Sequence, residues 1–205
     1  MTSLDGATPF VAALGHVLEQ AAPVVCQHLT LPDGRAFHHG FIRRRWSRGV
    51  SGWIVGRLLN LDGGRAGNAE GRFELRNEIV EDGSRGTVML WHRTHYSNSK
   101  PVSGIGLLRW APSRHVLIDS IGKRSWLEVE LVPTVEDRTV VMTSRRQWLR
   151  IGRVRLPLPR ALFGTAQTRE WEEPDGRLGL SLTLRHSLLG PYAGYEAVLT
   201  PGERR

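Results

Sequence analysis

The stretch Arg177-Leu-Gly-Leu-Ser-Leu-Thr-Leu-Arg185 decides the fold of this chain. Its leucines, at every second position from Leu178 to Leu184, alternate with small, polar or charged residues. Alternation with a period of two is typical of a β-strand that is buried on one face. Tight turns are expected on both sides, at Asp175-Gly176 and at Gly190-Pro191. The C-terminal third is therefore predicted to be a β-meander whose apolar face another layer must cover.

Similar short segments fill most of the chain before this stretch, and Gly, Pro, Asp or Asn stands in nearly every gap. Strands are expected over residues 36–46, 71–81, 85–96, 105–110, 116–121, 126–132, 138–149, 165–172, 177–186 and 192–199. About nine or ten strands at a spacing of roughly 8–12 residues indicate an antiparallel barrel or sandwich. We predict a mainly β fold, a calycin-like barrel or strongly curved sheet, with a β-sandwich as the alternative.

Two helices are expected beside the strands. Thr8 and Pro9 suit the N-cap and first position of an N-terminal helix. Residues 49–61 are apolar on nearly all sides and predict a second helix after the first strand, which would cap one end of a barrel. Barrels of this size leave room for a small ligand. We expect one domain over residues 1–205, with a helical segment at 1–30 and a β body at 36–200.

The composition is that of a globular protein, with 205 residues of which 40% are hydrophobic. Cys26 is the single cysteine, so an internal disulfide is excluded and nothing indicates an oxidising compartment. The N-terminus lacks the pattern of a signal peptide, and no apolar run approaches the roughly 20 residues of a membrane span. We therefore expect a soluble cytoplasmic protein.

The net charge of +8 raises the question of a nucleic-acid partner. The arginines alternate with apolar residues along predicted strands and often stand beside acids, as in Arg72-Phe-Glu-Leu-Arg76. A solvated face is the usual explanation of such charges. The densest basic run, Arg43–Arg48, is short and no nucleic-acid motif accompanies it, so we expect no nucleic-acid partner.

Candidate functional residues are the polar side chains on predicted inner faces. Trp91, Arg93 and His95 share one face of a strand, where Arg93 either holds an oxyanion inside the barrel or stays at the surface. Asp119 lies between isoleucines, which favours a raised pKa and an acid/base role, although an exposed strand end is the alternative. We predict Asp119 and His95 as catalytic residues. The predicted ligand-binding residues are Asn77, Trp91, Arg93, His186 and Tyr195.

Metal and cofactor motifs do not stand out. His92 and His95 are three apart on a predicted strand and point to opposite faces, as do His38 and His39, so neither pair suits one metal ion. No phosphate-binding glycine loop opens a helix after a strand, and no nucleophile motif is present. We expect no metal and no cofactor.

From about Phe37 to Pro201 the chain resembles a bacterial family, domain of unknown function 4166. The motifs that carry this resemblance are Trp91-x-Arg93, Ile118-Asp119-Ser-Ile-Gly122, Leu156-Pro-Leu-Pro-Arg160, Leu189-Gly190-Pro191, Tyr195 and Leu199-Thr-Pro201. The chain departs from the family pattern at Asp119-Ser-Ile, where the family has Glu-x-Phe, at His95, where it has Phe, and at Ala197, where it has Gly. Either the pocket differs in this member or those positions are not functional. The resemblance implies a mostly β domain, and its fusion to saccharopine-dehydrogenase-like reductases in other members suggests a reductase partner.

Three functions remain open at this point. The first is binding of a small hydrophobic molecule in an apolar barrel, beside a reductase or biosynthetic enzyme. The second is a cofactor-independent isomerase or cyclase acting there on a polyketide- or terpene-like substrate. The third is a membrane-surface or protein-interaction module built on Trp53, Ile54, Leu58 and Leu59 beside the arginines.

Overall fold

The computed structural model describes residues 7–47, 71–83, 86–97, 100–122, 125–152 and 154–202. The first strands are β1 (Arg35–Ser47), β2 (Gly71–Asp82), β3 (Gly86–Ser97), β4 (Lys100–Ala111), β5 (Val116–Ile121) and β6 (Leu127–Glu136). The later ones are β7 (Thr139–Ile151), β8 (Val154–Pro157), β9 (Thr165–Glu172), β10 (Leu178–His186) and β11 (Gly190–Pro201). The helix expected over residues 49–61, and with it Trp53, Ile54, Leu58 and Leu59, lies outside the described residues.

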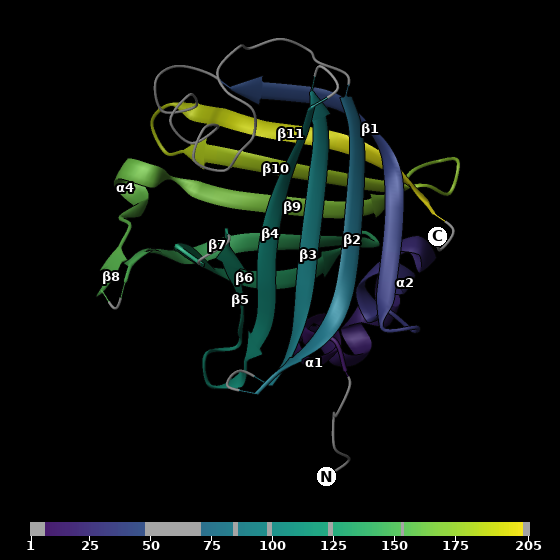
Figure 1. The fold of residues 1–205 in the computed structure, drawn as a ribbon, viewed down its shortest axis with the longest axis horizontal. Helices are drawn as coiled ribbons and strands as arrows, with labels where there is room; N and C mark the ends of the chain where they lie inside the picture. The colour runs from purple at the N-terminus through teal and green to yellow at the C-terminus, as the bar shows by residue number, and fades with distance from the viewer. Residues whose placement is uncertain are drawn as a thin grey trace.

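The strands form one closed antiparallel sheet (Figure 1). Its order is β6-β5-β4-β3-β2-β1-β11-β10-β9-β7-β8, and β6 also pairs with β7. That pairing joins the two sides of the sheet, so 10 strands close a barrel and β8 remains outside as an extra strand on β7. The predicted antiparallel barrel is therefore confirmed, and the sandwich alternative is wrong.

The leucine row of β10 defines the inner face of the barrel. Leu178, Leu180, Leu182 and Leu184 are all buried. The register places Leu180 opposite Glu170 of β9 and, on its other side, opposite Ala197 of β11. Side chains at paired positions of an antiparallel sheet point to the same face. Following the register from strand to strand therefore identifies inward-facing residues of the described strands, away from the bulges that shift the register.

The N-terminal segment closes one end of the barrel. It consists of α1 (Pro9–Leu14), the 3-10 helix η1 (Gly15–Gln20) and α2 (Pro23–Thr30), and Figure 1 shows it at the lower right. Thr8 caps α1 by accepting a hydrogen bond from the Val11 amide at 3.2 Å, so the predicted helix start is confirmed. The ring of Phe10 stacks on Trp91 at 6.1 Å. Phe10, Val25 and Leu29 are fully buried, and burying such a side chain stabilises the fold by about 1.5–3 kcal/mol.

The end of the barrel opposite the N-terminal helices is the distal end. There Ser47 of β1 pairs with Ala193 of β11. Beyond the barrel wall, β7 continues into a hairpin with β8, and the short helix α4 (Arg160–Phe163) leads back to β9. In Figure 1 these segments lie at the left, away from the N-terminal helices.

Candidate functional site

The inner face of β3 carries three of the predicted site residues. Trp91 and His95 are buried and Arg93 is half-buried. The His95 ring lies 4.7 Å from Phe73 and 5.6 Å from Tyr195, measured between ring centroids. Tyr195 is itself buried on β11. The structure therefore brings Trp91, Arg93, His95 and Tyr195 to one surface inside the barrel.

A second group of polar residues meets on the side of the N-terminal helices. The Asn77 amide of β2 donates a hydrogen bond to His28 Nε2 of α2 at 3.1 Å, which places the ring proton of neutral His28 on Nδ1. The same Nε2 atom lies 3.8 Å from the Glu170 carboxylate of β9. His38 of β1 meets the His28 ring edge-on at 4.6 Å. Four elements, of which β9 is far from the other three in sequence, thus supply one polar cluster.

Two glycines of β4 shape the space beside these groups. A Cβ atom at Gly106 would lie 2.8 Å from Asp119 Oδ1, so only glycine leaves room for this carboxylate as it is placed. At Gly104, opposite Arg93 in the register, an added Cβ would meet none of the described residues within 4 Å. On the inner wall, Asp119 therefore fills the space beside Gly106, whereas the space beside Gly104 is open among the described residues.

The charge of Arg93 reaches most of the interior. It acts on His28, His95, Asp119, Glu170 and Tyr195. The guanidinium also lies over the Trp91 ring at 4.6 Å. The charge of this one side chain therefore acts on groups from four strands and a helix.

Burial dominates the acid–base properties of the interior. It raises the pKa of Glu170 to about 7 and that of Asp119 to about 6, in both cases against the lowering effect of Arg93. Burial lowers the pKa of His38 to about 4 and that of His95 to about 3, and it lowers the pKa of His28 well below its ordinary value. Two carboxyl groups that titrate near neutrality therefore lie among histidines that stay uncharged.

Several buried polar atoms of this region have no hydrogen-bond partner among the described residues. They are His28 Nδ1, His38 Nδ1, Asn77 Oδ1, His95 Nδ1, Thr168 Oγ1 and both carboxylate oxygens of Glu170. Buried polar groups in proteins are almost always satisfied, and leaving one unpaired costs about 1–3 kcal/mol. The interior thus offers unpaired donors and acceptors, and the apolar residues of β10 lie beside those on β9.

The sequence predictions and the structure differ in three residues of this region. His186 is not in the interior cluster, because the pairing of β10 with β11 shifts register after Leu184. Its Nε2 lies 2.6 Å from the Ala161 carbonyl of α4 instead. Conversely, Glu170 and His28 belong to the cluster but are not among the residues predicted from sequence. His28 stands at helical spacing between buried Val25 and Leu29, and that pattern could have found it.

Among the described residues, no three His, Cys, Asp or Glu side chains are grouped so that they could hold a metal ion. Within the same residues, no helix has both the length and the apolar character needed to cross a membrane.

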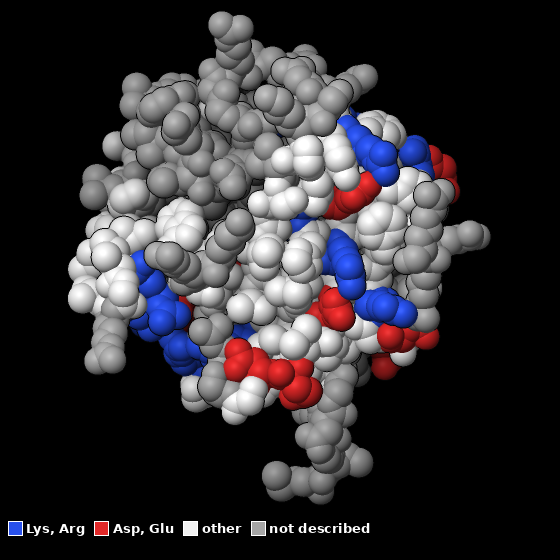
Figure 2. Space-filling model, viewed as in Figure 1, with Lys and Arg blue, Asp and Glu red and all other residues white. Residues whose placement is uncertain are grey.

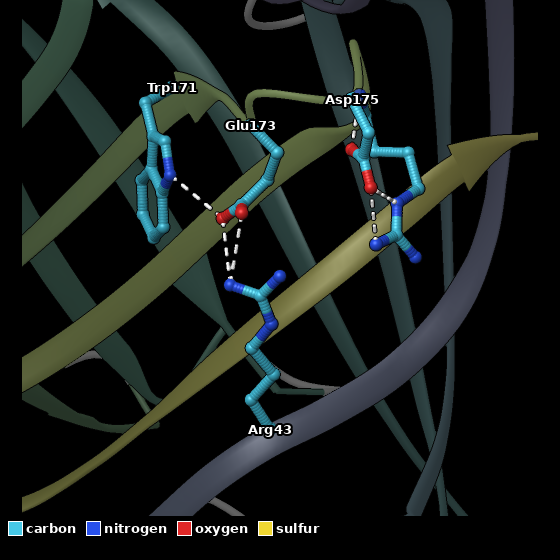
Figure 3. Close-up of polar contacts among 5 residues, drawn as sticks. Arg43, Trp171, Glu173 and Asp175 are labelled. Atoms are coloured by element: carbon cyan, nitrogen blue, oxygen red, sulfur yellow. Dashed lines mark hydrogen bonds and ion pairs between the residues drawn. The ribbon is translucent and has the colours of Figure 1, made fainter.

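The outer surface shows a different arrangement of charge. Basic and acidic side chains intermix over the face formed by β2, β3 and β4 (Figure 2), with ion pairs Arg72–Glu74 at 2.6 Å and Arg76–Glu78 at 3.1 Å. On β9 and β10 the outer face borders a hollow of about 740 Å³ that includes Trp171 and Glu173. Figure 3 shows Glu173 accepting from Trp171 Nε1 at 2.9 Å and pairing with Arg43 at 3.0 Å. The buried Glu173 carboxylate on this outer face therefore has both a hydrogen-bond donor and an ion-pair partner.

Comparison with known proteins places these features in a family context. Residues 23–199 match the family model described as "Domain of unknown function (DUF4166)". The chain is also similar to the uncharacterised protein YndH of Bacillus subtilis, with 26% identity over 134 residues, which cover 64% of this chain and 65% of the relative. The match thus spans about two thirds of each protein. Among the described elements, the matched segment includes α2, β1 to β10 and β11 as far as Leu199.

Proposed function

We propose that this chain, which belongs to the DUF4166 family, binds a small and mostly apolar molecule inside its barrel. The observation that carries the proposal is the set of buried, unpartnered polar atoms around Glu170. Folding leaves these atoms with a free-energy cost that a bound molecule can remove by hydrogen bonding. The leucines of β10 supply the apolar wall against which the rest of such a molecule packs.

The chemistry of the cluster limits the polar end of the ligand. Glu170 and Thr168 offer oxygen atoms to a hydroxyl group, and Thr168 can also donate. Arg93 offers a guanidinium to a carbonyl, enolate or carboxylate oxygen. The favoured ligand is therefore a compact hydrocarbon or aromatic skeleton that carries a hydroxyl group and a carbonyl or acidic oxygen at one end.

Native mass spectrometry of the purified full chain tests the proposal. We expect a retained small molecule, or uptake of the fluorescent anion 1-anilinonaphthalene-8-sulfonate, whose aromatic body and sulfonate match the wall and Arg93. Gly104→Leu directs a side chain into the space beside Arg93 and should abolish uptake. Ser103→Leu is the matched control, because Ser103 is the adjacent residue and is exposed. Equal uptake by both variants would place the probe elsewhere and contradict the proposal.

A second function, proton transfer to and from a bound substrate, is favoured by the two carboxyl groups that titrate near neutrality. A general acid or base works best when its pKa is close to the working pH, and burial raises the pKa of Glu170 to about 7 and of Asp119 to about 6. In such an isomerase, ionised Asp119 removes a proton from carbon beside a carbonyl, Arg93 stabilises the enolate oxygen, and protonated Glu170 returns a proton to another carbon. Asp119 then releases its proton to water and the Glu170 carboxylate takes one up from water, so both groups regain their starting protonation states. No cofactor is consumed.

Deuterium exchange distinguishes the two functions. A β,γ-unsaturated ketone incubated with the protein in D₂O should incorporate deuterium and shift its double bond if the interior transfers protons. Asp119→Asn should slow both the deuterium incorporation and the double-bond shift at least a hundredfold, within the range expected for loss of a general base. Glu173→Gln, on the outer face, should leave the rate unchanged. Exchange no faster than in buffer alone would leave binding as the function.

A further inference from the structure

The hairpin formed by β7 and β8 has two unlike faces. The register pairs Leu149 with Leu156 and Ile151 with Val154, so these four apolar side chains share one face. Leu149 also pairs with Leu127, which packs against the core, so this face continues the inner wall beyond the barrel. Ile151, Val154 and Leu156 are 59%, 57% and 44% exposed. The apolar lining therefore extends into solvent at the distal end.

The other face of the hairpin is basic. Arg150 and Arg155 both pair with Glu128, at 3.1 and 2.8 Å, and the Arg155 guanidinium lies over the Trp148 ring at 3.9 Å. Residues 139–164, which make up β7, β8 and α4, contain no Asp or Glu. Their arginines are Arg145, Arg146, Arg150, Arg153, Arg155 and Arg160. This stretch thus carries a strong local excess of positive charge.

More apolar side chains are exposed at the same end. Phe163 of α4 is 39% exposed, and Leu188 and Leu189 in the β10–β11 turn are 87% and 66% exposed. The Tyr192 hydroxyl donates to the Phe163 carbonyl at 2.9 Å and so ties α4 to β11. At the left edge of Figure 2, where Figure 1 places β8, basic side chains lie beside uncharged ones.

We propose that this distal surface, made of the β7–β8 hairpin, α4 and the β10–β11 turn, docks on an anionic lipid membrane. A surface that combines exposed aliphatic side chains with nearby arginines suits a lipid interface, where the apolar groups enter the acyl boundary and the cations meet acidic headgroups. A nucleic acid would neutralise the arginines but leave Ile151, Val154 and Leu188 in water. The proposal rests on this surface alone and does not require a ligand inside the barrel.

Vesicle flotation of the full chain tests the docking surface. The probes are vesicles of phosphatidylcholine alone and of phosphatidylcholine mixed with phosphatidylglycerol. We expect binding to the mixed vesicles, weakened by added salt because the charges are exposed. Arg145→Gln should lower the binding constant about fivefold. Val154→Ser should lower it roughly tenfold through lost apolar burial.

Matched controls lie at the other end of the barrel. Val80→Ser changes the same chemistry at a residue that is 38% exposed near the β2–β3 turn, and Arg35→Gln removes an exposed arginine at the start of β1. Both should bind vesicles like the wild type. Thermal melts identify any variant that fails to fold, and the replaced side chains are exposed, so little loss of stability is expected.

Three results would overturn the proposal. The first is no binding to either vesicle, and the second is equal losses in the distal variants and in their controls. The third is binding to duplex DNA that Arg145→Gln weakens and Val154→Ser does not, because that result assigns the surface to a nucleic acid. If the protein binds no ligand but still floats with anionic vesicles, the membrane-docking proposal is supported and the proposal of ligand binding inside the barrel is contradicted.

Discussion

Glu170 and Glu173 stand three residues apart, and their surroundings are opposite. Glu170 points into the barrel, is 0% exposed, and neither of its oxygens has a hydrogen-bond partner among the described residues. Glu173 lies on the outer side, is 7% exposed, and is held by Trp171 and Arg43 (Figure 3). Both carboxyl groups are removed from water, but only the outer one has hydrogen-bond partners among the described residues.

This difference separates a structural carboxylate from a candidate functional one. A buried charge with good partners ties elements together, and Glu173 joins the β9–β10 turn to β1. A buried acid without partners weakens the fold, and perturbed groups of this kind concentrate at functional sites. Asp119 shares the perturbed pKa but not the missing partners: burial raises its pKa to about 6, and Gly106 leaves room for its carboxylate.

The largest effect expected from this comparison is in the pH dependence of stability. Burial raises the pKa of Glu170 from 4.5 to about 7, so the folded protein holds this proton more tightly than the unfolded chain. This stabilisation of the folded state is fully present below the pKa of the unfolded chain. It is lost as pH rises through the pKa of the folded protein, and the total loss is roughly 3 kcal/mol. Glu170→Gln should lack this loss, as urea denaturation of both proteins across the pH range measures.

The buried histidines change the stability with pH in the opposite direction to Glu170, so their contribution must be distinguished from that of Glu170. The pKa of His38 is lowered by burial to about 4 and that of His95 to about 3, so their contribution is present above about 6.5 and is lost as pH falls. Both histidines remain in the Glu170→Gln variant, and their effect cancels in the difference between the two proteins. A difference that stays constant between pH 4.5 and 7 would mean that Glu170 has partners or solvent.

The barrel and much of its inner face were predictable from the sequence, because strand alternation has a period of two. The leucines of β10 and the shared face of Trp91, Arg93 and His95 follow directly from it. Closure was not predictable in detail. It depends on β1 pairing with β11, from the other end of the sequence, and on β7 pairing with β9 rather than only with its chain neighbours. Pattern alone does not specify such pairings between strands that do not follow one another in the chain.

Glu170 shows why part of the candidate site escaped prediction. On β9, one face carries Ala166, Thr168 and Glu170, while the other carries Gln167, Arg169 and Trp171. Neither set is apolar, so alternation cannot tell which one points inward. The burial of Glu170 is imposed by its neighbours, since it pairs with Leu180 on one side and Val140 on the other.

A smaller effect is expected at the outer carboxylate. Glu173→Ala leaves the Trp171 indole N–H and the Arg43 guanidinium without their acceptor. We expect a loss of about 2 kcal/mol in the free energy of unfolding, the range for hydrogen bonds to a charged group. Arg43→Ala should cost about 1 kcal/mol or less, because this side chain is 38% exposed and its charge is screened.

A double-variant cycle over Arg43 and Glu173 refines that prediction. Residues in direct contact show a coupling energy, and we expect about 1 kcal/mol here. Chemical denaturation of the wild type, both single variants and the double variant at one pH gives the value. Additive losses would show that the ion pair in Figure 3 contributes nothing beyond packing, and Glu173 would then no longer serve as the satisfied member of the comparison.

The smallest effect compares two inward glycines of β4, one beside a carboxylate and one beside open space. Gly106→Ala brings a methyl group to within 2.8 Å of Asp119 Oδ1, so the carboxylate must shift within a buried site. We expect a loss of roughly 1 kcal/mol. Gly104→Ala meets none of the described residues within 4 Å and should stabilise by about 0.5 kcal/mol, because alanine restricts the unfolded chain. Thermal unfolding of both variants measures the contrast. A loss at Gly104 as large as that at Gly106 would mean that the wall beside Arg93 is already filled, and the space on which ligand binding depends would be absent.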